Sequence, residues 1–308
     1  MNAEVAQTPA QILSRARAAY LGLALGDALG ATVEFMTPAE IRATYGTHKH
    51  LIGGGWLRLK PGQVTDDTGM ALALGEAILA SGGQIEAQAV AQAFNAWMRS
   101  KPVDIGNTVR RGILHFRMTG ETRMPEDEHA AGNGALMRVL PVALATLGAD
   151  ADEVRRAVLA QAHVTHHNPL SDAACLCVTR MVQRALRGED MTDLYAAEVL
   201  PLFAAQPAFA LRAKREENPS GYVVDTLRAV FQALFDHDDF AGSLMDVVNR
   251  GGDADTTGAI VGMIAGALYG EAALPARWLR VLDPAVRARC EMQAEALLKQ
   301  TLNHSMHG

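Results

Sequence analysis

Hydrophobic and polar residues follow a helical periodicity along almost the whole chain. Thr8 and the proline after it are typical of an N-cap and first helical turn, and they predict a helix that continues to about Gly30. Only the stretch from Leu51 to Leu59 favours extended structure. The same periodicity predicts further helices at about 66–81, 85–100, 107–118, 134–147, 151–165, 170–187, 191–205, 222–236, 241–249, 255–269 and 284–302.

Three glycines of the first predicted helix share one face, because Gly22, Gly26 and Gly30 are spaced four residues apart. A face without side chains lets another backbone approach closely, as in membrane helix dimers. This helix also carries charged residues such as Arg15 and Asp27. We therefore expect the glycine face to pack tightly against another helix inside the core of a water-soluble protein.

The composition agrees with a helical protein. Hydrophobic residues make up 49% of the 308 residues and charged residues 20%, whereas aromatic residues, which favour β-sheet, make up only 5%. There is no fixed repeat, low-complexity tract or linker long enough to divide domains. We predict an all-α fold with one compact, many-helix domain over residues 1–308. The most irregular stretches are 31–65 and 119–133, and long connections of this kind are usually functional or disordered.

Charge and cysteine content exclude several classes of protein. The net charge is −6 and no basic block occurs, so we expect no general nucleic-acid binding. The three cysteines, Cys175, Cys177 and Cys290, lack the spacing of a zinc site and are expected to be buried free thiols in a reducing compartment. The N-terminus has no signal-peptide pattern, and the longest apolar stretch, 258–270, is too short to span a bilayer. We expect a cytoplasmic protein.

Two acidic clusters open predicted helices at distant points of the chain. The first is Thr-Asp-Asp-Thr at 65–68 and the second is Asp-Ala-Asp-Thr-Thr at 253–257. Carboxylate and hydroxyl oxygens are hard ligands that suit Mg²⁺ or Mn²⁺. Thr65 with the acids behind it is also a common capping arrangement at a helix start, which is the simpler interpretation of the first cluster. If the two clusters meet in the fold, they form the two halves of one metal site.

The second cluster has two other interpretations. An EF-hand is excluded because its fifth position is Thr257 and its twelfth is Ile264, where a bidentate glutamate is required. An Asp-x-Asp-x-Thr phosphatase would use Asp253 as a nucleophile at the end of a buried strand. No alternation of strands and helices supports the parallel sheet that such a phosphatase needs.

Several weaker polar segments have both structural and functional interpretations. Asp104 and Asn107 precede a predicted helix, where they either cap it or grip a cation such as a guanidinium. The Gly-Asn-Gly at 132–134 opens another predicted helix and forms either an anion cradle or a plain turn. Histidines 163, 166 and 167 lack further zinc ligands, so they either complement a helix end or contact a ligand. Tyr222 is either a core aromatic residue or a stacking partner for a nucleobase.

The order of these segments resembles the ADP-ribosylglycohydrolase family. The matching segments are Gly-Asp-Ala-Leu-Gly at 26–30 with Glu34, then 65–68, 132–134, Thr165-His166, 221–226, and Gly-Gly-Asp-Ala-Asp-Thr-Thr-Gly at 251–258. They cover about residues 20–270, and the last one is the most specific. The stretches 52–63 and 102–108 resemble the branch of the family that acts on the nitrogenase iron protein in nitrogen-fixing bacteria.

The resemblance implies an all-α fold and a centre of two divalent ions, Mn²⁺ or Mg²⁺. By this carry-over, Asp104 and Asn107 would meet an arginine guanidinium, and Glu34 would lie beside the reacting ribose. Asp67 or Glu34 would act as the base that activates a water molecule or hydroxyl. The implied metal ligands are Thr65, Asp66, Asp67, Asp253, Asp255 and Thr256. The implied contacts with the diphosphate are Gly132, Asn133 and Gly134, and those with the adenosine are His166 and Tyr222.

The implied activity is hydrolysis of the N-glycosidic bond between ADP-ribose and an arginine of the nitrogenase iron protein. The resemblance also implies a PII signalling protein as a partner that draws the enzyme reversibly to the membrane. We expect a monomer. Three alternatives are a family member with a different target, a non-catalytic member that binds ADP-ribose or is purely structural, and a phosphatase that uses Asp253.

Overall fold

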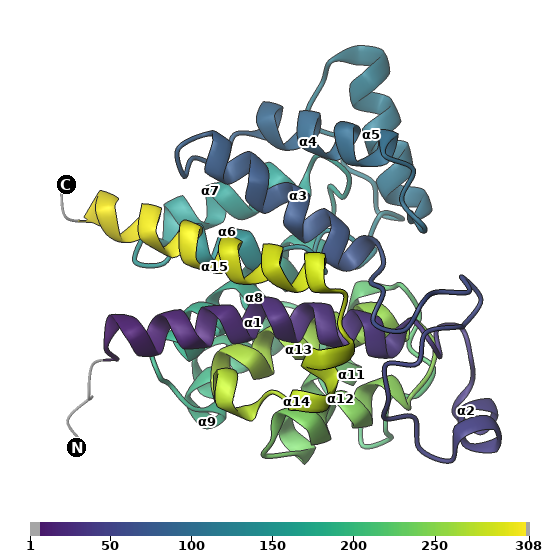
Figure 1. Cartoon of the computed structure of the whole chain (residues 1–308). Helices are drawn as coiled ribbons and strands as arrows, with labels where there is room; N and C mark the ends of the chain where they lie inside the picture. The colour runs from purple at the N-terminus through teal and green to yellow at the C-terminus, as the bar shows by residue number, and fades with distance from the viewer. Residues whose placement is uncertain (1–6, 306–308) are drawn as a thin grey trace.

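The chain folds almost entirely into helices (Figure 1). The computed structural model describes residues 7–305, with side chains up to residue 301. Within these residues the only β-pairing is two isolated bridges, Gly54 with Leu59 and Gly132 with Tyr222, so the predicted all-α class is confirmed. The α-helices are α1 (Pro9–Gly30), α2 (Pro38–Tyr45), α3 (Asp66–Ala80), α4 (Ala87–Arg99), α5 (Asn107–Thr119), α6 (Leu140–Ala145), α7 (Ala151–Ala162), α8 (Pro169–Leu186), α9 (Met191–Leu194), α10 (Leu200–Ala205), α11 (Val223–Asp236), α12 (Phe240–Val248), α13 (Ala254–Tyr269), α14 (Ala276–Val281) and α15 (Pro284–Ser305).

The predicted helix bounds agree with most of these helices, and three differences are informative. The short helix α2 lies in the stretch 31–65 that was predicted to be irregular, and α14 lies between two predicted helices, where none was predicted. The predicted helix at 191–205 is interrupted by a π-helical turn, η1 (Tyr195–Val199). The predicted helix at 134–147 is wrong in its first half, because residues 134–138 form turns and α6 begins only at Leu140. Pro141 has no N–H to donate to the preceding turn, so it favours a helix start over a continuation.

The predicted glycine face forms the contact between α1 and α13, which lie side by side in the lower part of Figure 1. A Cβ atom built on Gly22 would lie 2.2 Å from the carbonyl oxygen of Gly262, and one on Gly26 would lie 2.0 Å from that of Gly258. Gly30 meets the backbone of Ala254 in the same way, so the two helices run antiparallel. This close packing places the end of α1 against the start of α13, where the second acidic cluster lies.

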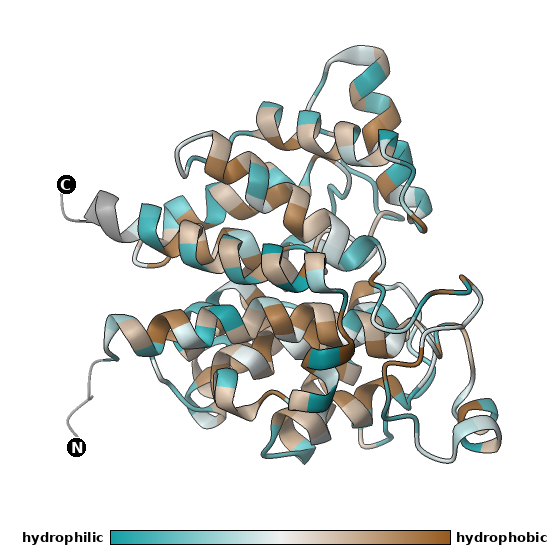
Figure 2. Ribbon diagram, in the orientation of Figure 1, coloured by the Kyte–Doolittle hydropathy of each residue, from teal (hydrophilic) through white to brown (hydrophobic). Residues whose placement is uncertain are grey.

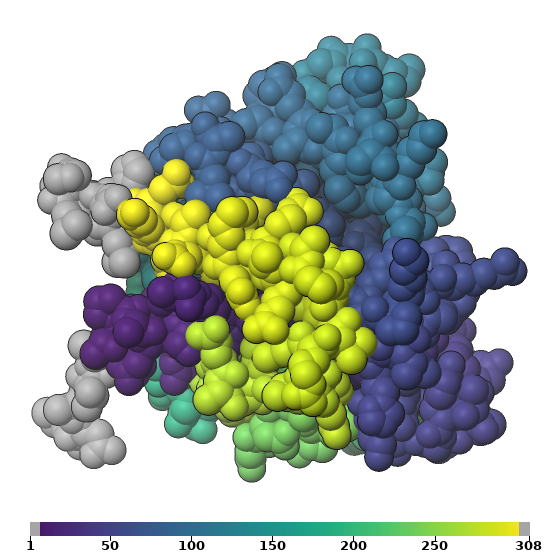
Figure 3. Space-filling model, viewed as in Figure 1, coloured from purple at the N-terminus to yellow at the C-terminus, as the bar shows by residue number. Residues whose placement is uncertain are grey.

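The first acidic cluster reaches the same place through α3. This helix packs against α1 and α15, and α15 crosses the face of the molecule seen in Figure 3. The backbone N–H of Thr65 donates to the Asp27 carboxylate near the end of α1, which fixes the start of α3 there. The buried hydrophobic core includes residues of α1, α13, α8 and α11, and hydrophobic residues of α1 appear brown in Figure 2.

The irregular segment 31–65 is tied to the turn that precedes α13. Phe35 N donates to Gly252 O, and Gly252 N donates to Met36 O. Gly251 and Gly252 have positive φ angles of 71° and 65°, and a Cβ on either would lie 2.1 Å from a carbonyl oxygen. Only glycine fits both requirements. The segment therefore carries Glu34 to the second acidic cluster.

The cysteines and the apolar character of the helices were also subjects of prediction. Cys175, Cys177 and Cys290 are buried free thiols, as expected. Over residues 7–305, none of the helices combines the length and the apolar character that crossing a membrane requires.

Candidate metal and ligand site

The two acidic clusters meet in the fold. The hydroxyl oxygen of Thr65 lies 3.3 Å from Asp67 Oδ2 and 3.4 Å from Asp255 Oδ2. The hydroxyl of Thr256 donates to the same Asp67 Oδ2 at 3.3 Å. Oxygen atoms from the starts of α3 and α13 therefore form one continuous cluster.

The capping interpretation of these helix starts is not supported. Thr65 occupies the N-cap position of α3 and Asp253 that of α13, but neither side chain accepts a hydrogen bond from the first turn of its helix. The N-cap of α5 is Gly106, so neither Asp104 nor Asn107 caps that helix. These polar side chains are available for other contacts.

Asp27 supplies the missing cap of α3 from a different helix, a role that was not predicted for it. Its carboxylate accepts from Thr65 N at 3.0 Å, from Thr68 N at 3.0 Å and from the Thr68 hydroxyl at 2.5 Å. The side chain is fully buried. Because Asp27 binds the helix start, Thr65 keeps its hydroxyl free to face the acidic cluster. The sequence indicated this role only by placing an acidic residue, Asp27, among the small and apolar residues at the end of a predicted helix.

The acidic cluster favours a cation. Burial raises the pKa of Asp66 to about 7, with a further contribution from the charge of Asp104. Burial also raises the pKa of Glu34 to about 8 and places those of Asp67 and Asp255 well above the ordinary range. Buried carboxylates that repel one another are costly unless a positive charge offsets them.

The donor set fits a hard divalent ion. Asp67 Oδ1 is buried and has no hydrogen-bond partner among the described residues, as expected of an oxygen whose partner is a cation. Ligand oxygens of Glu34, Asp253 and Asp255 all lie within 4.8 Å of one another, which is close enough for one ion to contact all three. The family resemblance implies that Glu34 lies beside the reacting ribose; the structure groups it with two of the expected ligands.

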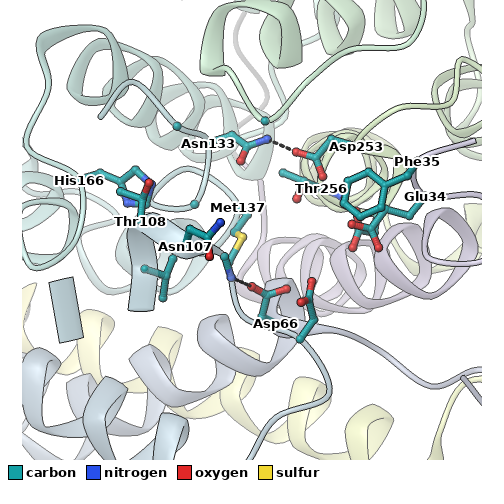
Figure 4. Close-up of a pocket in the computed structure, with 17 residues that line it drawn as sticks. Glu34, Phe35, Asp66, Asn107, Thr108, Asn133, Met137, His166, Asp253 and Thr256 are labelled. Atoms are coloured by element: carbon teal, nitrogen blue, oxygen red, sulfur yellow. Dashed lines mark hydrogen bonds between the residues drawn. The ribbon is translucent and has the colours of Figure 1, made fainter. Parts of the chain in front are cut away.

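A cavity of about 250 Å³ begins at this cluster (Figure 4). In Figure 4 Glu34 and Phe35 lie on one side of the cavity and His166 on the other. Thr65 and Asp67 do not line the cavity but contact residues that do; Tyr222 also lies outside the lining, and its backbone pairs with Gly132. The expected site residues that line the cavity are Glu34, Asp66, Asp104, Asn107, Gly132, Asn133, Gly134, His166, Asp253, Asp255 and Thr256.

The Gly-Asn-Gly segment at 132–134 does not open a helix, contrary to the prediction. Its residues enter a series of turns, and the N–H of Asn133 donates to Gly221 O at 3.0 Å, so that N–H is not available to an anion. The Asn133 side chain donates to Asp253 Oδ2 at 2.6 Å and to Thr226 Oγ1 at 2.9 Å. Asn133 therefore orients one of the expected metal ligands.

The three neighbouring histidines have different surroundings. His163 pairs with Asp172 at 2.9 Å, and His167 Nδ1 lies 2.7 Å from Met124 O, so both rings stabilise local structure. His166 is buried in the cavity wall, where burial together with the charge of Arg138 lowers its pKa to about 3. Its ring is neutral at physiological pH.

Two aromatic residues at the cavity were not predicted to belong to the site. Phe35 lines the cavity, and its ring centroid lies 5.4 Å from that of Trp56. Trp56 donates from its indole N–H to Glu34 Oε2 at 2.6 Å. Phe35 has a φ of 62°, which is rare for a bulky residue. Both rings are largely exposed. Trp56 lies in the stretch 52–63 that resembles the family, but neither residue was expected to have a role in the site.

Comparison with known proteins identifies the family. Residues 8–305 match the model of the ADP-ribosylglycohydrolase family. The chain is 49% identical to ADP-ribosyl-[dinitrogen reductase] glycohydrolase of Rhodospirillum rubrum, over 94% of this chain and 98% of that protein. It is 32% identical to ADP-ribosylarginine hydrolase Tri1 of Serratia proteamaculans, over 87% of this chain and 75% of that protein.

A solved structure agrees with these relatives. It is described as an ADP-ribosylglycohydrolase-related protein complex, and it superposes with a TM-score of 0.82 at 34% identity, covering 95% of this chain and 99% of that one. The chain therefore belongs to the ADP-ribosylglycohydrolase family. It is an enzyme of the hydrolase class that cleaves the link between ADP-ribose and a protein.

Proposed function

We propose that this enzyme removes ADP-ribose from an arginine side chain of the nitrogenase iron protein and thereby reactivates it. The arginine linkage is supported by the likeness to ADP-ribosylarginine hydrolases, and the target by the higher identity to the relative that acts on dinitrogen reductase. The observation that carries the proposal is the meeting of both acidic clusters at the floor of one cavity.

The proposed activity depends on two divalent ions, Mn²⁺ or Mg²⁺. Asp67 Oδ1 is buried and has no partner within residues 7–305, and the donor set consists of oxygen atoms alone; both observations support such a centre. When bound, the ions would supply Lewis acidity that orients the ribose hydroxyls and lowers the pKa of a water molecule. The residues proposed to hold them are Thr65, Asp66, Asp67, Asp253, Asp255 and Thr256, with Glu34 beside them.

The other residues around the cavity are proposed to bind and orient the substrate. Asp104 and Asn107 hold the guanidinium, since a neighbouring carboxylate favours the protonated form, which is the better leaving group. Glu34 or Asp67 accepts the proton of the attacking water. Gly132, Asn133 and Gly134 lie along the diphosphate, and His166 and Tyr222 flank the adenosine.

The test is incubation with iron protein that carries ADP-ribose on arginine, with and without Mn²⁺. Release of free ADP-ribose that requires both metal and Asp253 is the expected result. Release from other ADP-ribosylated arginine proteins but not from the iron protein would indicate a family member with a different target. Binding of ADP-ribose without any release would indicate a non-catalytic member.

We also propose how the enzyme is regulated and in what oligomeric state it acts. A PII signalling protein would bind the enzyme and hold it reversibly at the membrane, and the enzyme itself would be a cytoplasmic monomer with one domain. Co-sedimentation with membranes, with and without PII, tests the first expectation. Size-exclusion chromatography with light scattering tests the second.

A further inference from the structure

A buried chain of hydrogen bonds leads to the histidine in the cavity wall. Arg138 donates from Nη2 to Thr165 Oγ1 at 2.8 Å, and Thr165 Oγ1 lies 2.8 Å from His166 Nδ1. The guanidinium of Arg138 is fixed by three further bonds to oxygen atoms, Gln161 Oε1, Gln161 O and Gly134 O, and by a weaker one to Met70 Sδ. All three members of the chain are buried, so water does not compete for these bonds.

The direction of each bond follows from the chemistry of the groups. A guanidinium only donates, so the Thr165 oxygen accepts from Arg138. The acceptor for the Thr165 hydroxyl proton, among the described residues, is then His166 Nδ1. If His166 Nδ1 were protonated, Arg138 and His166 would both donate to the Thr165 hydroxyl. The proton of that hydroxyl would then be buried without an acceptor, which is unfavourable. Nδ1 is therefore unprotonated, and the neutral ring carries its proton on Nε2.

The protonated edge of this ring faces the cavity. His166 Nε2 has no hydrogen-bond partner within the described part of the chain, and His166 lines the same cavity as Asp253. A Cβ on Gly132 would lie 3.0 Å from Nε2, and one on Gly134 would lie 2.8 Å from Cε1. The two glycines, which have no side chains, therefore leave the space that the His166 ring occupies.

We infer that Arg138 and Thr165 are positioning residues that hold His166 as an Nε2–H donor directed at an acceptor atom of the ligand. The ligand's identity rests on the proposed function. ADP-ribose offers suitable acceptors in its diphosphate, its ribose oxygens and the ring nitrogens of adenine. A donor such as the adenine amino group is rejected at this position, because two donors would face each other.

The tautomer is measured in the ligand-free protein by ¹⁵N NMR of the imidazole nitrogens. In the wild-type protein we expect an unprotonated Nδ1 and a protonated Nε2 for His166. Thr165→Ser keeps the hydroxyl and is expected to keep this pattern. Thr165→Val removes the hydroxyl at similar volume and is expected to give a mixture of tautomers. A proton on Nδ1 of His166 in the wild-type protein would overturn the inference, whatever the variants do.

Binding of free ADP-ribose is then measured by calorimetry. We expect Thr165→Val to weaken binding about tenfold, the effect of one lost hydrogen bond, and Thr165→Ser to restore it. The matched control is Thr179→Val, which removes a buried hydroxyl that donates to Cys175 O within α8. Equal losses in Thr165→Val and Thr179→Val would overturn the positioning role. If the wild-type protein has the Nε2–H tautomer but does not bind ADP-ribose, the chain of hydrogen bonds from Arg138 to His166 is supported and the proposed function is overturned.

Discussion

Removing one buried charge from the acidic cluster is expected to have opposite effects with and without metal. Asp67 is 1% exposed, its Oδ1 has no partner among the described residues, and its pKa is raised by burial and by the charges of Asp27 and Asp66. In Asp67→Asn the amide carries no charge and can donate to neighbouring carboxylates. The variant should therefore be more stable than the wild type without metal, although it loses a proposed metal ligand.

The magnitude follows from the cost of an unsatisfied buried polar or charged group, about 1–3 kcal/mol. An entropy of unfolding of about 2.1 cal/mol/K per residue makes 1 kcal/mol worth about 1.5 °C in a chain of this length. Asp67→Asn should thus raise the Tm by roughly 2–5 °C in EDTA at pH 8. In contrast, Mn²⁺ at 100 times its Kd should stabilise the wild type by about 2.7 kcal/mol, and the variant by much less.

The pH dependence has a definite sign. A raised folded-state pKa means that the folded protein binds more protons than the unfolded chain, so metal-free stability falls as pH rises above the ordinary carboxyl pKa of about 4. The advantage of Asp67→Asn should therefore be largest at pH 8 and disappear near pH 4. Differential scanning calorimetry in EDTA and in MnCl₂ measures both effects, with the exposed Asp238→Asn as the control. This reasoning would be refuted by a variant that is less stable than the wild type in EDTA, or by one that gains as much stability from Mn²⁺ as the wild type does.

Three further predictions concern packing, positioning and proton release. Gly26→Ala places a Cβ 2.0 Å from Gly258 O and should lower the free energy of unfolding by at least about 1–3 kcal/mol in chemical denaturation; unchanged stability would contradict the close helix contact. Trp56→Phe keeps a ring beside Phe35 but removes the N–H bonded to Glu34, so Mn²⁺ affinity measured by calorimetry should fall about tenfold, while Ile52→Ala should leave it unchanged. Because the carboxyl pKa values are raised, Mn²⁺ binding at pH 7 should release protons and strengthen toward pH 8; calorimetric heats that do not depend on the buffer's ionisation enthalpy would contradict this.

The helices could be predicted from the sequence because their periodicity is local. The sequence also predicted that the glycine face of α1 packs closely against another helix, because a helix face without side chains lets a second backbone approach. Which helix would meet that face could not be foreseen, because the partner glycines lie more than 200 residues away. The Gly-Asn-Gly segment was misplaced in a helix because local periodicity outweighed the proline at 141.

The site could be predicted only in part, for a related reason. Clusters of acids next to threonines and glycines have a local signature, so both halves of the cluster were found. Asp27, Trp56 and Arg138 act through residues that are distant in sequence, so their roles are not visible within their own segments. The capping alternative for Thr65 could be rejected only once its hydroxyl was located beside Asp255.

The most direct test of the proposed centre is anomalous diffraction at the manganese edge from crystals grown with MnCl₂. Two manganese peaks enclosed by the side-chain oxygens of residues 65–67 and 253–256, at the floor of the cavity, are the predicted result. No manganese at that position, or manganese bound only elsewhere on the molecule, would contradict the account.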